Sequence, residues 1–190
     1  MSEFMMISPH YNVEHWRALD FSTEDDWQKA IEIFEDRVRG RFLDIISLFE
    51  HCTYGGFAVL ALDCLLIETL QQFREGLSET PRRKSENFYV SFLTETSFGS
   101  FFTTEMARMF YDQIRCGILH QAEVKGSSRV LIREGEPLVR ITDNGKGLII
   151  NRKLFHEQLV KEFEDYVTQL PKDDPANMTL REKFKRKMEC

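Results

Sequence analysis

The feature that most constrains the fold is an apolar run from Phe57 to Phe73 that leaves almost no polar face. A helix that is apolar nearly all round is buried on every side, as in the centre of a bundle. The run contains two acids, Asp63 and Glu68, whereas a membrane span needs about 20 apolar residues with few or no charges. We therefore expect the central helix of a bundle with no membrane contact, ending at Gly76.

Other apolar residues recur at the three- to four-residue spacing of amphipathic helices. The first such stretch is interrupted near Gly40 and Arg41. The last is expected to be capped by Asn151 and to stop before Pro171. The predicted helices span about 25–51, 88–93, 101–121 and 151–170.

Between the last two predicted helices the apolar period changes to alternation, which is typical of strands. We expect short strands near Val130, near 138–141 and near 148–150, with a hairpin turn at Asp143-Asn144-Gly145. The stretch Asn144 to Gly147 is interpreted as this turn, because it lacks the setting and the Lys-Ser/Thr ending of a phosphate loop. The predicted fold is mostly α: a four- to five-helix bundle with a small β-hairpin or meander at about 128–150, before the last helix.

The 190 residues suit one domain. We expect an irregular segment over 1–24, a helical domain over 25–170 and a polar basic tail over 171–190, either solvated or in contact with phosphates. The net charge is −6, and the basic residues show only a modest excess in the second half of the chain. A general binder of long nucleic acids has a strong basic face, so that class is not expected.

Four cysteines occur without a CxxC pair, and residues 1–20 show no basic start followed by an apolar run. Both observations predict reduced thiols in a cytoplasmic protein without a signal peptide. No spacing suited to a metal or cofactor is found, so we expect neither. The histidines read as surface or packing residues are His10, His15, His51 and His156.

The strongest candidate for chemistry is the pair Arg115 and His120, near the end of an otherwise apolar predicted helix. Burying either side chain without a partner would be costly. Five residues of ideal helix turn through about 500°, which leaves the two side chains about 140° apart. They converge on one ligand only if the helix loosens near Gly117 or if a second copy supplies the partner.

A helical bundle with an R-x4-H motif late in the chain resembles the HEPN superfamily, over about residues 25–170. The resemblance implies a metal-independent endoribonuclease of a toxin, antiviral defence or RNA-processing system, in which two copies bring their motifs to one cleft. It transfers the catalytic roles to Arg115 and His120. Cys116 stands where many members have a polar residue, and some members bind without cutting.

The residue chemistry fits this expectation. Histidine moves protons near neutral pH, and arginine offers a permanent, planar positive charge to a phosphorane. Glu68 is expected to orient one of the pair, with Asp63 as the other candidate acid and Arg41 as a rival partner for Glu68. Gln121 and Glu123 either face water or line the mouth of the cleft.

Three functional classes remain open from the sequence. The first is a homodimeric hydrolase that cleaves single-stranded RNA. The second is a module that binds RNA or a nucleotide without cutting. The third is a structural helical subunit in which Arg115 and His120 pair internally. A partner protein, such as an antitoxin or regulator, is compatible with each class.

Overall fold

The computed structural model describes residues 5–50, 52–171 and 175–189, with the backbone alone at Glu50 and 175–177. It is mostly helical, with a small sheet that precedes α8, which confirms the predicted fold class. The helical elements are α1 (Val13–Arg17), α2 (Glu24–Val38), η1 (Arg39–Leu43), α3 (Asp44–Glu50), α4 (Gly56–Glu75), α5 (Ser85–Glu95), η2 (Ser97–Ser100), α6 (Thr104–Met109), η3 (Phe110–Arg115), α7 (Cys116–Gln121), α8 (Arg152–Gln169) and α9 (Pro175–Met188). The strands are β1 (Arg129–Leu131), β2 (Val139–Ile141) and β3 (Leu148–Asn151).

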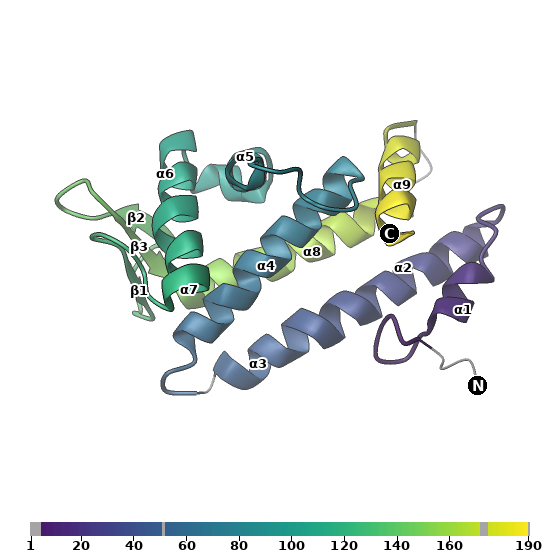
Figure 1. The fold of residues 1–190 in the computed structure, drawn as a ribbon, viewed down its shortest axis with the longest axis horizontal. Helices are drawn as coiled ribbons and strands as arrows, with labels where there is room; N and C mark the ends of the chain where they lie inside the picture. Colours follow the sequence, from purple (N-terminus) through teal and green to yellow (C-terminus); the bar gives the residue numbers. More distant parts are fainter. Residues whose placement is uncertain (1–4, 51, 172–174, 190) are drawn as a thin grey trace.

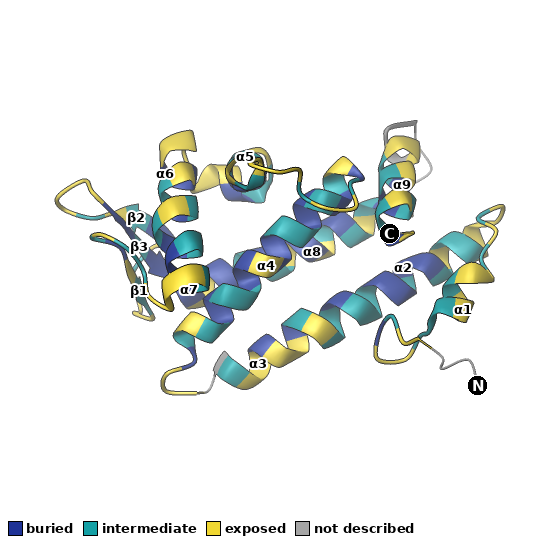
Figure 2. Cartoon of the chain, viewed as in Figure 1, coloured by how far each residue is buried: buried dark blue, intermediate teal, exposed yellow. Residues whose placement is uncertain are grey.

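Helix α4 is the centre of the bundle, as its all-round apolar sequence predicts. It contacts α3, α5, α7, α8 and α9, and Figures 1 and 2 show it running through the molecule with buried residues along its length. By length and composition alone α4 could cross a membrane, because an 18-residue stretch within it has a mean hydropathy of 1.4. Half of that stretch is buried inside the protein. Gly76, in the left-handed region at φ +69°, ends the helix.

Two long helices each contain a π-helical segment. The predicted helix over about 25–51 consists of α2, η1 and α3, and the π turns of η1 occupy the position where the apolar stripe is interrupted. The side chain of Pro9 packs against Gly40, where a Cβ atom would lie 2.2 Å from Pro9 Cγ. In the same way α6, η3 and α7 form the predicted helix over about 101–121, and Arg115 ends its π segment.

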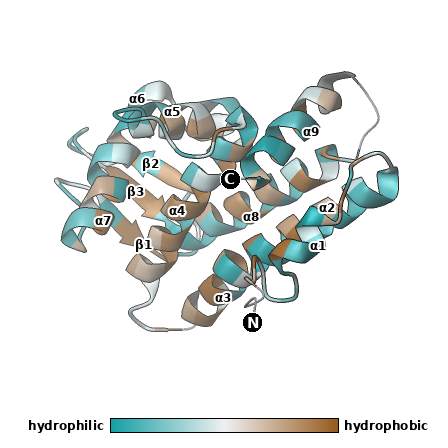
Figure 3. Ribbon diagram, turned by 45° about the vertical axis from the view of Figure 1, so that its right-hand side comes forward, coloured by the Kyte–Doolittle hydropathy of each residue, from teal (hydrophilic) through white to brown (hydrophobic). Residues whose placement is uncertain are grey.

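The sheet has the strand order β1-β3-β2 and is not a meander. β3 lies in the middle, antiparallel to β2 through the predicted hairpin and parallel to β1. Leu148 and Ile150 of β3 are fully buried, whereas β1 is only half-buried or exposed. The most apolar strand therefore takes the central position, and Figure 3 shows the sheet as one of the most hydrophobic parts of the chain.

Asn151 precedes α8, but its side chain does not cap the helix, contrary to the prediction. Its Nδ2 atom donates instead to the backbone carbonyls of Arg133, at 3.1 Å, and Glu136, at 3.4 Å. Those two residues bracket the turn between β1 and β2. The amide thus ties that turn to the start of α8, a role that depends on contacts distant in the sequence.

The segment expected to be a polar basic tail forms α9 and packs into the core, so it is not a solvated tail. Contact of its basic residues with phosphates stays a prediction. Phe184 is fully buried and lies with ring centroids 5.3 Å from Phe34 and 5.8 Å from Phe73. Arg181 forms a bidentate pair with Glu24, at 2.9 and 2.7 Å. The sequence prediction missed this helix because its apolar residues are sparse between many charges. At the other end, the segment expected to be irregular contains α1, capped by Asn12.

We expect Phe184→Ala to lower the free energy of unfolding by about 3–5 kcal/mol, because it empties a fully enclosed aromatic site. Urea denaturation followed by far-UV circular dichroism measures the effect. Phe101→Ala is the matched control, since Phe101 is 41% exposed, and it should cost less than about 1 kcal/mol. Equal losses for the two variants would show that α9 does not contribute to the core.

Candidate functional site

Arg115 is held in an ion pair with Glu68, which reaches it from α4. Arg115 Nη2 donates to Glu68 Oε2 at 3.0 Å, and the two side chains are only 15% and 16% exposed. Ser85, the first residue of α5, donates its hydroxyl to the other carboxylate oxygen at 3.2 Å. Three elements therefore meet at this carboxylate, and Arg41 is not its partner.

Two tyrosines flank the guanidinium of Arg115. Its central carbon lies 5.8 Å from the ring centroid of Tyr89 and 5.5 Å from that of Tyr111, within reach of cation–π attraction. Burial alone would lower the pKa of Arg115, but its interactions with Tyr89 and Glu68 outweigh burial and raise that pKa. Burial also raises the pKa of Tyr89, whose hydroxyl donates to the Cys64 carbonyl at 2.6 Å. The site thus has a permanent positive charge beside two neutral phenols.

His120 contrasts with Arg115 in its surroundings. It lies on α7 and is exposed, and its imidazole forms no hydrogen bond or ion pair with another described residue. Residues 116–121 are α-helical, which retains the expected separation of about 140° between the two side chains. The helix loosens in η3, before Arg115, and not between Arg115 and His120.

Gly117 serves a packing role in this arrangement. After α7, Ala122 adopts the left-handed conformation at φ 57° and turns the chain back along the helix. A Cβ atom on Gly117 would lie 2.4 Å from the carbonyl oxygen of Glu123. The returning segment therefore packs directly on the helix between Arg115 and His120, which makes a glycine necessary there.

Gln121 and Glu123 are exposed and make no side-chain hydrogen bond or ion pair with another described residue. They lie near His120 in the chain, and the structure does not join them to Arg115. In the part of the chain that the structure describes, no group of three or more His, Cys, Asp or Glu side chains is placed to hold a metal ion. Metal-independent chemistry stays a prediction.

Asp63, the second candidate acid, pairs elsewhere. Its Oδ1 lies 2.7 Å from Nδ1 of His156 on α8, and both side chains are buried. His156 was interpreted as a surface or packing residue, and its pairing in the core was not foreseen. About one and a half turns of α4 thus separate Asp63, which is directed at α8, from Glu68, which is directed at the end of η3.

Sequence reasoning also missed a second buried carboxylate. Glu162 of α8 pairs with Arg74 of α4 and accepts hydrogen bonds from the backbone and hydroxyl of Ser97. The tyrosines and Ser85 around Arg115 were missed as well. Their spacing along the chain is that of ordinary helix residues, so no local pattern distinguishes them.

Comparisons of the chain with models of known protein families, with curated proteins and with solved structures find no match. The functional argument therefore rests on the geometry and chemistry of the site.

We expect Glu68→Gln to destabilise the protein by about 1–3 kcal/mol, because it leaves the buried guanidinium of Arg115 without its counter-charge. Chemical denaturation measures the loss. The control is Glu86→Gln, whose partner Arg108 lies 3.6 Å away with both side chains at least 49% exposed. It should change stability by about 0.5 kcal/mol or less. A Glu68 variant as stable as this control would mean that the ion pair does not hold Arg115.

Proposed function

We propose that this chain is a homodimeric, metal-independent endoribonuclease of the HEPN type that cleaves single-stranded RNA with Arg115 and His120. The observation that carries the proposal is the contrast between the surroundings of these two side chains. Arg115 is a positive charge immobilised by Glu68, Tyr89 and Tyr111, and His120 is an exposed, unengaged imidazole five residues later. Catalysis of phosphoryl transfer needs one fixed charge and one mobile proton, and these two environments suit the two roles.

In the proposed reaction the 2′-hydroxyl of one nucleotide attacks the adjacent phosphorus. A bond forms between O2′ and phosphorus, and the bond from phosphorus to the 5′-oxygen of the next nucleotide breaks. His120 accepts the 2′-hydroxyl proton, and a protonated imidazole returns a proton to the leaving 5′-oxygen. Arg115 stabilises the charge on the phosphorane. The products are a 2′,3′-cyclic phosphate and a 5′-hydroxyl.

A second copy completes the proposed site. With about 140° between them on one helix, Arg115 and His120 of a single chain do not face the same phosphate. A two-fold axis beside α7 would bring each His120 opposite the Arg115 of the other chain, and two-fold symmetry is the commonest way to duplicate a surface. Leu65, one turn before Glu68 on α4, is 44% exposed and supplies apolar area beside the motif.

The ion pair of Arg115 also supports a second candidate. Glu68 already occupies part of its hydrogen-bonding capacity, and the side chain is only 15% exposed. An RNA- or nucleotide-binding module, or a structural partner subunit, would have the same arrangement without turnover. In each case we propose a cytoplasmic protein, acting in defence or RNA processing, with an antitoxin or regulator as a compatible partner.

Wild-type protein should cut a mixed-sequence single-stranded RNA in the presence of EDTA, leaving 2′,3′-cyclic phosphate ends. His120→Ala should lower the rate by about 10²–10⁴-fold, the usual contribution of a general acid–base group. Arg115→Lys should also lose activity relative to wild type, because an ammonium lacks the planar fork of a guanidinium. Gel analysis of cleavage and mass spectrometry of the ends measure both effects.

The control is His10→Ala, an exposed histidine that contacts Asp36 on α2. It should cleave like wild type. Thermal melting of every variant separates a lost reaction from a lost fold. If folded wild type binds RNA and cuts nothing, the binding module is correct. If it does neither and Arg115→Lys melts much earlier than His10→Ala, the pair is structural.

Sedimentation velocity at tens of micromolar protein should show a dimer. Leu65→Glu should shift it to a monomer and abolish cleavage, because it adds two like charges to a symmetric apolar contact. Leu154→Glu is the matched control on α8, where Leu154 is 37% exposed, and it should leave the dimer intact. A wild-type monomer under these conditions would contradict a site shared between two copies.

A further inference from the structure

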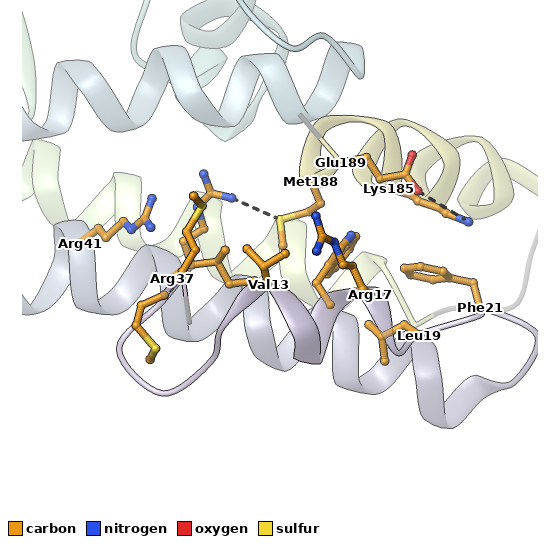
Figure 4. A pocket seen from close by; sticks show the side chains of 13 residues that line it. Val13, Arg17, Leu19, Phe21, Arg37, Arg41, Lys185, Met188 and Glu189 are labelled. Atoms are coloured by element: carbon orange, nitrogen blue, oxygen red, sulfur yellow. Dashed lines mark hydrogen bonds and ion pairs between the residues drawn. The ribbon is translucent and has the colours of Figure 1, made fainter. Parts of the chain in front are cut away.

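A cavity of about 590 Å³ lies between α1 with its flanking segments, the helix formed by α2 and η1, and α9 (Figure 4). Its volume falls in the range of sites for small organic ligands. None of its lining residues belongs to α4, α5 or η3, the elements that position Arg115. In Figure 1 α1 and α7 lie toward opposite ends of the molecule, so this cavity is separate from the Arg–His site.

The cations that line the cavity come from α1, from the helix formed by α2 and η1, and from α9, and two of them have carboxylate partners. Arg17 lies 3.1 Å from Glu14, and Lys185 lies 3.9 Å from Glu189. Glu189 is the sole acid among the described residues that line the cavity. These pairs account for two of its four positive charges.

Arg37 and Arg41, one helical turn apart, carry the other two charges. Neither forms an ion pair with a described residue. Arg37 is partly buried and donates only to the sulfur of Met188, at 3.9 Å, across the cavity. Burial and the positive charge of Arg41 lower the pKa of Arg37. A charge that is desolvated beside a like charge is stabilised by any anion placed between the two.

The remaining wall is apolar and adaptable. Met5, Met6 and Met188 contribute flexible thioethers, which fit irregular apolar shapes, and Trp16 and Phe21, which also line the cavity, pack edge to face. Among the described lining residues there is no Ser, Thr, Asn or Gln side chain to recognise a base or a sugar. The lining therefore suits a hydrocarbon chain better than a nucleotide.

We propose that this cavity binds a single-chain amphiphilic anion, with its carboxylate or phosphate headgroup on Arg37 and Arg41 and its aliphatic body along the methionine wall. Guanidinium groups bind both headgroups through two parallel hydrogen bonds. Burial of the chain against Met188 and Trp16 supplies the affinity, and the arginines select the charged end.

The test uses the full chain carrying Trp27→Phe, which leaves Trp16 as the reporter at the cavity. Dodecanoate and dodecyl phosphate are titrated below their micellar concentrations, with dodecanol and AMP as neutral and nucleotide comparisons. We expect a change of Trp16 emission with at least one of the two anions, and calorimetry should give one site per chain. Dodecanol should bind at least tenfold more weakly, and the tighter anion identifies the headgroup.

Arg37→Met keeps the length of the side chain and removes its charge, and it should weaken binding of that anion at least tenfold. Arg41→Gln is a second variant at the more exposed position, in case Arg37→Met fails to fold. Arg108→Met, on α6 outside the cavity, should bind like the reporter protein. Absence of binding by both anions, equal affinity for dodecanol, or no effect of either arginine variant would overturn the proposal. So would tighter binding of AMP.

Discussion

The structure depends on packing α4 against α3, α5, α7, α8 and α9 while it carries two carboxylates. A buried acid needs a partner, because its charge costs several kcal/mol when left alone in an apolar interior. Asp63 meets this demand through His156 of α8, and Glu68 through Arg115 at the end of η3. Each pair ties α4 to a different helix. Because the carboxylates on the central helix need partners, the pairing of Glu68 also fixes the position of the candidate catalytic arginine, Arg115.

Two π-helical segments place charged residues where regular helices would not. Such segments are rare and occur often at functional sites. η1 contains Arg41, which lines the cavity beside α1, and η3 ends on Arg115, beside the tyrosines. The extra residue in each π turn rotates the chain that follows it.

Much of the candidate site was predictable because it is local. Arg115 and His120 stand out as polar residues near the end of an apolar helix, and Glu68 stands out as an acid within an apolar run. Pairing them required only the argument that buried charges find partners. Tyr89 and Tyr111 were not predictable, since aromatic residues at helical spacing usually fill cores. The choice between Asp63 and Glu68 depended on the rotation of α4 relative to its neighbours.

The sequence by itself determined the helices and strands between residues 25 and 170, because apolar periodicity and turn residues act within a few positions; it did not reveal α1 or α9. It also determined that the run after Gly56 is central. Only the tertiary structure decided that β3 lies between β1 and β2, that α9 closes the core through Phe184, and that Arg37 and Arg41 share a cavity with three methionines. These outcomes depend on which distant surfaces are left to be covered once α4 is buried. That is a property of the whole packing arrangement, and no local pattern encodes it.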